Sequence, residues 1–326
     1  MVPRVRPWQA DLALLGVAAV WGATFVTVKR ATLTLPVLPF LAVRFALAGA
    51  VLALAFPSAW RQFRAPLIAR GVGIGAFLFL GYLLQTWGLQ YTTAGRAGFI
   101  TGLSVVLVPL GQGALWRRPP GRQAVAGVAL ATAGLAAMGW EAGELGRGDV
   151  LVLGCALAFA AHILSVAAWA GDAHPVPITA VQVLTVALAS ALAALLPGAC
   201  PSGWSWHLLG PSVLRVWDAL LLTGLFATAV AFLVQNAVQR FTEPTHTALI
   251  FSAEPVFATV FAWLLGGETL TPRGLLGGAL VVLGMLAAQL PAGPGKGPRP
   301  GARSPVPPGH LRPGLRDGCQ RGSGPP

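Results

Sequence analysis

The chain has 326 residues, of which 55% are hydrophobic and only 10% are charged, whereas ordinary globular domains have roughly 25% charged residues. This composition excludes a water-soluble globular protein and favours a chain that lies largely in lipid. The three cysteines show no ligand spacing, which argues against a disulfide framework or a metal site. The net charge of +12 does not indicate a nucleic-acid partner, because the basic residues stand between apolar stretches and in the tail.

Apolar stretches separated by short polar breaks fill most of the chain. A hydrocarbon layer ~30 Å thick needs roughly 20 residues per helix, and the stretches match that length. They are predicted as helices because lipid leaves backbone groups no water to bond, and no alternating barrel pattern is present. In chain order the ten predicted spans are 11–29, 37–57, 67–89, 96–116, 121–140, 150–170, 176–196, 216–238, 245–265 and 272–290.

The second half of the chain repeats the first. An offset of 150 residues aligns 82–140 with 232–290 without a gap, and an offset of 138 aligns the earlier part. The matched pairs include Gln85 with Gln235, Gly127 with Gly277, Gly134 with Gly284, Asp11 with Asp149, and Arg44 with Gln182. Because each copy has five spans, an odd number, the second copy must be inverted relative to the first, which is an architecture of alternating access.

The predicted fold is therefore an all-α membrane protein with ten transmembrane helices, arranged as two inverted five-helix repeats around a central cavity. The expected parts are a cytoplasmic N-terminus (1–10), the first repeat (11–140), a linker (141–149), the second repeat (150–290) and a disordered Pro-, Gly- and Arg-rich tail (291–326). With both termini inside, nine Lys and Arg residues of the N-terminus and loops and six of the tail are cytoplasmic, against six outside. A multi-pass protein of the plasma membrane is expected.

Short motifs stand in order along the chain, some in the first half and some in the second. They are Trp21-Gly22-Ala23-Thr24-Phe25, Arg44-Phe45, Gln90-Tyr91-Thr92-Thr93-Ala94, Glu254-Pro255-Val256-Phe257, Gly267-Glu268 and Gly277-Gly278. On these motifs the chain resembles the EamA-type branch of the drug/metabolite transporter superfamily across residues 11–290. The resemblance implies ten helices, a cavity lined mainly by spans one to four and six to nine, and export or uptake of small metabolites. One departure is that the first copy ends its fourth span with Trp116-Arg117-Arg118 in place of a Gly-Glu pair.

Two ionisable residues within the spans are the sharpest candidates for a substrate or coupling site. Glu254 is the one acidic residue in the middle of a span, where a carboxylate costs several kcal/mol unless it is protonated, paired or hydrated. It is either a titrating group of the cavity or a neutral carboxyl at a helix break made by Pro255. Arg44 either attracts an anionic group, pairs with Glu254, or snorkels to the headgroups.

Polar and aromatic residues at matching depths complete the candidate site: Gln182, Thr24, Gln85, Asn236, His162 and Trp21. The amides serve either substrate contact or interhelical hydrogen bonds, which contribute ~1 kcal/mol or less each. His162 is either a proton relay or a packed, hydrogen-bonded histidine. Trp21, with Tyr82, Trp87 and Phe251, is a candidate for an aromatic cavity wall.

These patterns favour a secondary carrier of small metabolites or drug-like solutes, a permease or exporter that works by alternating access. No phosphate-binding loop, metal-ligand set or catalytic constellation is apparent, so no cofactor, metal or enzyme activity is expected. The expected partners are a small-molecule substrate and the bilayer, with no nucleic acid. The Gly-x-x-x-Gly sequences indicate packing within the chain or a homodimer contact. A membrane scaffold or lipid scramblase is the alternative, and a membrane-embedded enzyme is a more remote one.

Overall fold

The computed structural model describes residues 6–117, 120–139, 146–266 and 271–289, and no β-strand occurs in these ranges. The longer helices are α1 (Pro7–Ala31), α2 (Val37–Ala55), α3 (Ala65–Gly88), α4 (Ala94–Gly102), α5 (Ser104–Trp116), α6 (Arg122–Gly139), α7 (Arg147–Trp169), α8 (Pro175–Ala194), α11 (Ala231–Val238), α12 (Pro244–Phe251), α13 (Glu254–Gly266) and α14 (Pro272–Gln289). Shorter elements are η1 (Pro57–Gln62), η2 (Trp206–Leu208), α9 (Leu209–Arg215), α10 (Trp217–Leu221), the π-helix η3 (Leu222–Val230) and η4 (Gln239–Phe241). The predicted tail and the Gly267-Glu268 motif lie outside the described residues.

The helices have the length and composition that a bilayer requires. Within the described residues, seven helical stretches are long and apolar enough to cross a membrane, and two shorter apolar helices cover 122–138 and 272–288. The seven stretches are 8–31, 37–55, 65–88, 94–116, 147–169, 175–194 and 217–241. The chain is thus a multi-pass membrane protein, as its composition predicts.

Two of the predicted spans are interrupted near their middle. Helix α4 ends at Gly102 and α5 begins at Ser104, while α12 ends at Phe251 and α13 begins at Glu254. The two breaks stand 150 residues apart, at the offset that aligns the two halves. Pro255 follows directly at the start of α13, where its fixed φ angle suits a new helix.

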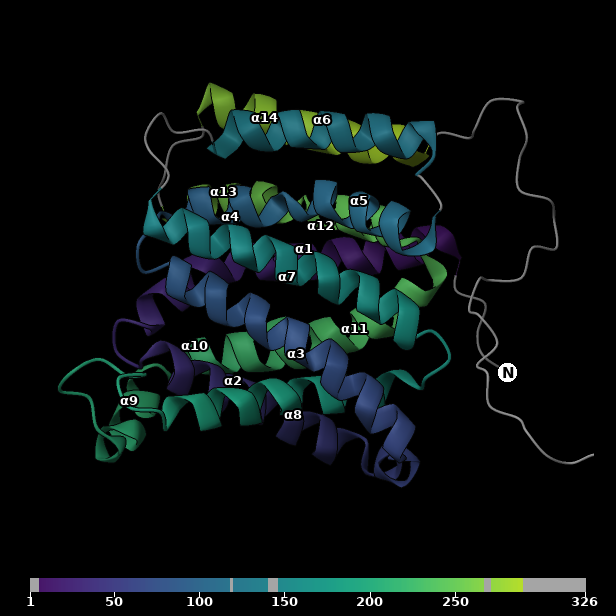
Figure 1. The fold of residues 1–326 in the computed structure, drawn as a ribbon. Helices are drawn as coiled ribbons and strands as arrows, with labels where there is room; N and C mark the ends of the chain where they lie inside the picture. The colour runs from purple at the N-terminus through teal and green to yellow at the C-terminus, as the bar shows by residue number, and fades with distance from the viewer. Residues whose placement is uncertain (1–5, 118–119, 140–145, 267–270, 290–326) are drawn as a thin grey trace, which may run out of the picture. The chain divides into compact units, whose positions relative to one another are not determined.

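Helices α6 and α14 lie side by side, and glycines form their contact (Figure 1). A Cβ atom added to Gly127 would lie 2.6 Å from the Gly284 carbonyl oxygen, and one added to Gly134 would lie 2.5 Å from that of Gly277. Because the earlier residue of one helix meets the later residue of the other, the helices run antiparallel. Any larger residue at these positions would separate two backbones that now touch.

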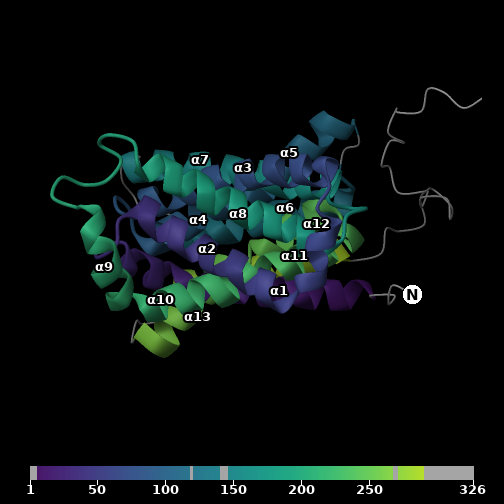
Figure 2. The ribbon, with the colours of Figure 1, turned by 90° about the horizontal axis from the view of Figure 1, so that it is seen from below.

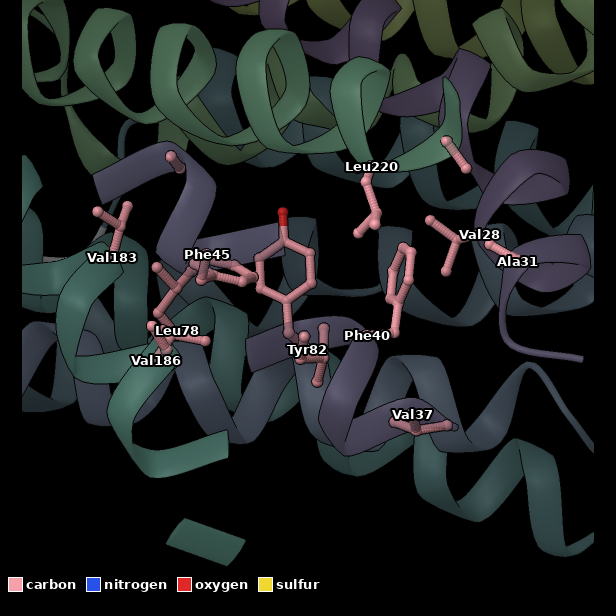
Figure 3. Packing of buried hydrophobic residues seen from close by; sticks show 14 of the residues in the cluster. Val28, Ala31, Val37, Phe40, Phe45, Leu78, Tyr82, Val183, Val186 and Leu220 are labelled. Atoms are coloured by element: carbon pink, nitrogen blue, oxygen red, sulfur yellow. The ribbon is translucent and has the colours of Figure 1, made fainter. Parts of the chain in front are cut away.

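The remaining helices pack around a core shared by both halves of the sequence. Helix α2 packs on α8, α3 packs on α7 and α8, and α1 packs on α13, as two views at right angles show (Figure 1, Figure 2). Aromatic side chains fill the centre of the largest buried cluster, where Phe45 and Tyr82 meet edge to face at 5.0 Å with Phe40 and Leu78 nearby (Figure 3).

Candidate functional site

A cavity lies among helices α1, α2, α3, α4, α7, α11, α12 and the first residues of α5 and α13. About 720 Å³ there is not filled by atoms, part of it open to solvent. Six of the eight predicted site residues line it: Trp21, Thr24, Arg44, Gln85, His162 and Glu254. The other lining side chains include Phe25, Val28, Leu78, Tyr82, Thr101, Ser104, Phe159, Phe232, Gln235 and Phe251. The aromatic wall predicted from sequence includes Trp21, Tyr82 and Phe251, whereas Trp87 does not line this cavity.

Close packing of α1 on α13 positions Trp21 and Thr24 in the cavity wall. A Cβ atom at Gly22 would lie 2.6 Å from the carbonyl oxygen of Glu254, so glycine permits the two backbones to touch at the α12–α13 break. Trp21 and Thr24, on either side of Gly22 along α1, consequently face the same cavity as Glu254. The Trp-Gly-Ala-Thr motif therefore has a packing role as well as a lining role.

Arg44 is held in the cavity wall by hydrogen bonds to two other helices. Its side chain is only 2% exposed. Its Nε donates to Thr228 Oγ1 at 2.8 Å, and its Nη2 donates to the Tyr82 hydroxyl at 3.4 Å. Its guanidinium carbon also lies 4.7 Å from the centre of the Tyr82 ring, within the range of a cation–π contact. No ion pair joins Arg44 to Glu254 among the described residues, so the pairing considered from sequence is not formed in this state.

The π-helix η3 supplies hydrogen-bond partners for two side chains of the cavity wall, Arg44 and Trp21. A π-helical turn is wider than an α-helical one and is often found at functional sites. Thr228 Oγ1 donates to the Thr223 carbonyl five residues earlier and accepts the bond from Arg44. The carbonyl of Ala227 accepts from Trp21 Nε1 at 2.8 Å. The widened turn thus fixes both the cation and the indole of the cavity wall.

Unlike Arg44, Glu254 is not held by neighbouring side chains, because its carboxyl group makes no hydrogen bond or ion pair with the described residues. It is the first residue of α13, at the break after α12, and lines the cavity. An ionised carboxyl group in an apolar setting is costly unless it is paired or hydrated. The open acceptor is therefore free to take a proton or a cationic group from the cavity.

A chain of buried polar groups lies behind this wall and contains the two remaining predicted residues. His162 Nε2 lies 3.3 Å from Gln182 Oε1, and Gln182 Nε2 donates to Asn236 Oδ1 at 3.0 Å. Asn236 in turn donates to Thr179 Oγ1 at 3.1 Å. The sequence placed Gln182 and Asn236 beside Arg44 and Glu254, but they join α8 to α11 and reach the cavity only through His162. The structure thus gives these two amides interhelical partners and places them outside the cavity lining.

The amides matched by the repeat both face the cavity. Gln85 Nε2 donates to Thr101 Oγ1 at 3.3 Å, from α3 to α4. Gln235 Nε2 donates to Gln239 Oε1 at 2.9 Å, while its buried Oε1 has no hydrogen-bond partner among the residues that the structure describes. A buried amide oxygen without a donor is a ready acceptor for a ligand N–H group. No group of three or more His, Cys, Asp or Glu residues suited to a metal ion occurs in the described part of the chain.

Several lining or supporting residues were not predicted from the sequence. Ser104 lines the cavity, and the 150-residue offset assigns it to Glu254, so the repeat alignment could have found it. Thr101 also lies in the wall, and Thr228 holds Arg44 from behind. No signal distinguished these two threonines from the others in apolar spans, because their roles depend on the helix opposite.

Comparisons with known proteins agree with this architecture. The sequence model of the EamA-like transporter family matches residues 8–140 and again 146–288. An uncharacterized transporter of Archaeoglobus fulgidus is 35% identical over 286 residues, covering 88% of this chain and 87% of the relative. The threonine/homoserine exporter RhtA of Escherichia coli K12 is 31% identical over 268 residues, covering 75% of this chain and 79% of the exporter. A solved crystal structure shares the fold with a TM-score of 0.70 at 21% identity, covering 87% of this chain and 97% of that one.

The double match spans nearly all of the described chain, and the relatives that carry a functional name are transporters. Both copies contribute helices to the cavity. The chain belongs to the EamA-like transporter family and is a membrane transporter.

Proposed function

We propose that the protein is a secondary transporter that moves a small zwitterionic solute, of the amino-acid class, through the central cavity by alternating access. The observation that carries this proposal is the pair of opposite ionisable groups in one cavity: Arg44, held by Thr228 and Tyr82, and Glu254, whose carboxyl group has no partner in the described part of the chain. A solute with a carboxylate and an ammonium group would complement both. Guanidinium groups suit carboxylates because their planar fork matches the two oxygens.

Arg44 keeps donor capacity for such a ligand. A guanidinium has five N–H donors, and Nη1 of Arg44 makes no hydrogen bond to the described residues. The exporter RhtA, a relative at 31% identity, is named for two amino acids, threonine and homoserine. This relationship supports the amino-acid class and favours the direction of export for this chain.

The antiparallel helix contact supports the inverted arrangement on which alternating access depends. Gly277 and Gly284 are the residues that the 150-residue offset assigns to Gly127 and Gly134, and the contacts are reciprocal between the two helices. The helix breaks before Ser104 and Glu254 stand at the same offset. An arrangement of ten membrane helices as two inverted repeats, with boundaries near residues 11–140 and 150–290, accounts for both observations.

The proposed setting is a plasma membrane, with both termini on the cytoplasmic side, as the Lys and Arg distribution favours. In this orientation the end of α1 that carries Asp11 is cytoplasmic. The end that carries Lys29 then faces outward.

The test measures solute exchange and thermal unfolding of the purified protein with three ligands, the exchange being measured in proteoliposomes. The ligands are L-threonine, its carboxamide, and the hydroxy acid that lacks the amino group. We expect only the zwitterion to exchange across the membrane and to raise the unfolding temperature. Arg44→Gln should abolish that exchange, while Arg70→Gln, which alters an exposed ion pair with Asp172, should leave it unchanged. Equal responses to the three ligands, or exchange that persists in Arg44→Gln, would contradict the zwitterion assignment.

A further inference from the structure

Two ion pairs join the halves of the sequence, at opposite ends of α1. At one end, Arg96 Nη2 lies 3.0 Å from Asp149 Oδ2, linking α4 to α7. At the other end, His246 Nε2 lies 3.1 Å from Asp11 Oδ1, linking α12 to α1. Lys29, near the C-terminal end of α1, lies beside the Arg96–Asp149 pair. Its Nζ donates to the carbonyl of Thr92, and the hydroxyl of Thr92 donates to Asp149. Eighteen residues of α1 separate Lys29 from Asp11, which is ~27 Å along a helix.

The two ion pairs are equivalent by the sequence repeat. The offset of 138 residues takes Asp11 to Asp149, and the offset of 150 takes Arg96 to His246. The helices that carry them also line the central cavity, through Thr101 on α4 and His162 on α7 at one end. At the other end, α1 contributes Trp21 and α12 contributes Phe251. Each pair therefore joins two cavity-lining helices.

The surroundings of the two pairs differ strongly. The Asp149 side chain is 4% exposed and accepts further hydrogen bonds from the Thr92 hydroxyl at 2.9 Å and the Gly146 amide at 2.9 Å. The Asp11 and His246 side chains are each 22% exposed. Thr242, the repeat equivalent of Thr92, lines the same cavity as Asp11. Among the described residues it makes no hydrogen bond to Asp11. The Asp149 end is thus held by a network, and the Asp11 end by a single contact.

A second cavity adjoins the weaker pair. About 680 Å³ of unfilled space lies there, and Asp11, Thr242, Glu243 and His246 supply its polar wall. Glu243 is the one further titratable group in this wall. The helices packed against α12 otherwise present uncharged groups to it: α5 gives Gln112, which accepts from Thr245 at 2.8 Å, and α6 and α14 give alanines. The carboxyl groups in this wall are therefore those of Asp11, in contact with His246, and of Glu243.

We propose that the Asp11–His246 pair is a proton-sensitive latch, which holds α1 to α12 when His246 is protonated and releases this end of the transport pathway when it is neutral. The equivalent Arg96–Asp149 pair keeps its charge at all physiological pH values, because a guanidinium does not deprotonate there. Histidine is the side chain that ordinarily changes charge between pH 5 and 8. Opening at the Asp11 end consequently responds to pH, and opening at the Asp149 end does not. This latch rests on the proposed alternating access.

The test measures accessibility and needs no substrate. A single reporter cysteine is placed at Thr242 in a full-length chain whose native cysteines are replaced, and its labelling by a membrane-impermeant maleimide is measured at pH 6 and pH 8. Each rate is divided by the rate for the same reporter with His246→Arg at the same pH, which cancels the pH dependence of the thiol itself. A partly exposed ion pair changes such an equilibrium by up to about five-fold. We expect this ratio to be near one at pH 6 and to rise to about three- to five-fold at pH 8.

Two further variants separate the latch from other effects of pH. Asp11→Ala should give fast labelling at both pH values, because neither form of His246 then has its partner. His207→Arg, which changes an exposed histidine whose ring hydrogen-bonds with Ser205, should keep the pH response of the parent chain. A ratio that stays at one at both pH values, in folded protein, would overturn the latch. If labelling follows the expected pattern but no solute exchanges in proteoliposomes, the latch stands and the transport proposal fails instead.

Discussion

Replacing Gly22 with alanine should force α1 away from α13 and destabilise the cavity wall. The added Cβ would lie 2.6 Å from the Glu254 carbonyl oxygen and 2.8 Å from the Ala258 amide nitrogen. Both are backbone atoms, so no rotamer change can relieve the contact. The helices must separate by about 0.8 Å before the nearest contact reaches the ordinary range of 3.4 Å or more. Overpacking of this kind destabilises a protein by about 1–3 kcal/mol.

The same helix provides a matched control at Gly16, where an added Cβ would meet no atom within 4 Å. Alanine there gains helix propensity worth up to about 1 kcal/mol without a clash. We therefore expect Gly22→Ala and Gly16→Ala to differ in free energy of unfolding by about 1–4 kcal/mol, with opposite signs relative to the parent chain.

The assay is thermal unfolding of the two variants in the same detergent or nanodisc, followed by their ligand-induced shift. Gly22→Ala should unfold several degrees below the parent and Gly16→Ala at or above it. Gly22→Ala should also lose the shift produced by L-threonine, because Glu254 moves with α13. Equal unfolding temperatures for the two variants would refute the account of the α1–α13 contact.

Three further predictions concern the cavity and the outer helix pair. Glu254→Gln should weaken the pH dependence of transport between pH 5 and 8 in proteoliposomes and leave only the part due to His246, because an amide cannot bind or release the proton, whereas the exposed Asp218→Asn should leave the full pH dependence. Thr228→Val should destabilise the fold by about 1–3 kcal/mol, since a buried arginine loses its hydrogen-bond acceptor, and Thr228→Ser should restore most of the loss; denaturant unfolding measures both. Gly134→Ala should lower the unfolding temperature and Gly113→Ala should not, because a Cβ meets the facing backbone at 2.5 Å in the first case and no atom within 4 Å in the second.

The sequence predicted the helical spans well because their signals are local. The structure has α2 at Val37–Ala55 where the sequence predicted 37–57, since Pro36 and Pro57 bound the apolar run on both sides. The break within the fourth predicted span was not predicted, whereas the break beside Pro255 in the ninth span was one of the two alternatives considered for Glu254. The sequence stays apolar across both breaks, so hydropathy does not show them. The exact positions at which the helices are interrupted depend on the packing of neighbouring helices. The π-helix Leu222–Val230 was invisible for the same reason.

The candidate site was predicted in part. Arg44 and Glu254 stood out because ionisable residues are rare in membrane spans, and both line the cavity. Their partners could not be read from the chain: a tyrosine and a threonine hold Arg44, and nothing in their local sequence points toward α2. Gln182 shares the depth of Arg44 in the repeat, yet it faces His162 and Asn236, since the two copies differ in the side chains around them.

The reciprocal glycine contact between α6 and α14 also bears on assembly. Each half of the sequence supplies one strip of small residues, and that strip has no partner until the other half is present in the bilayer. Two halves synthesised as separate chains, one ending after α6 and the other beginning before α7, would have to recognise each other through this strip. A single alanine at Gly134 would then obstruct reassembly more severely than it obstructs the covalent chain, in which tethering already holds the two surfaces together.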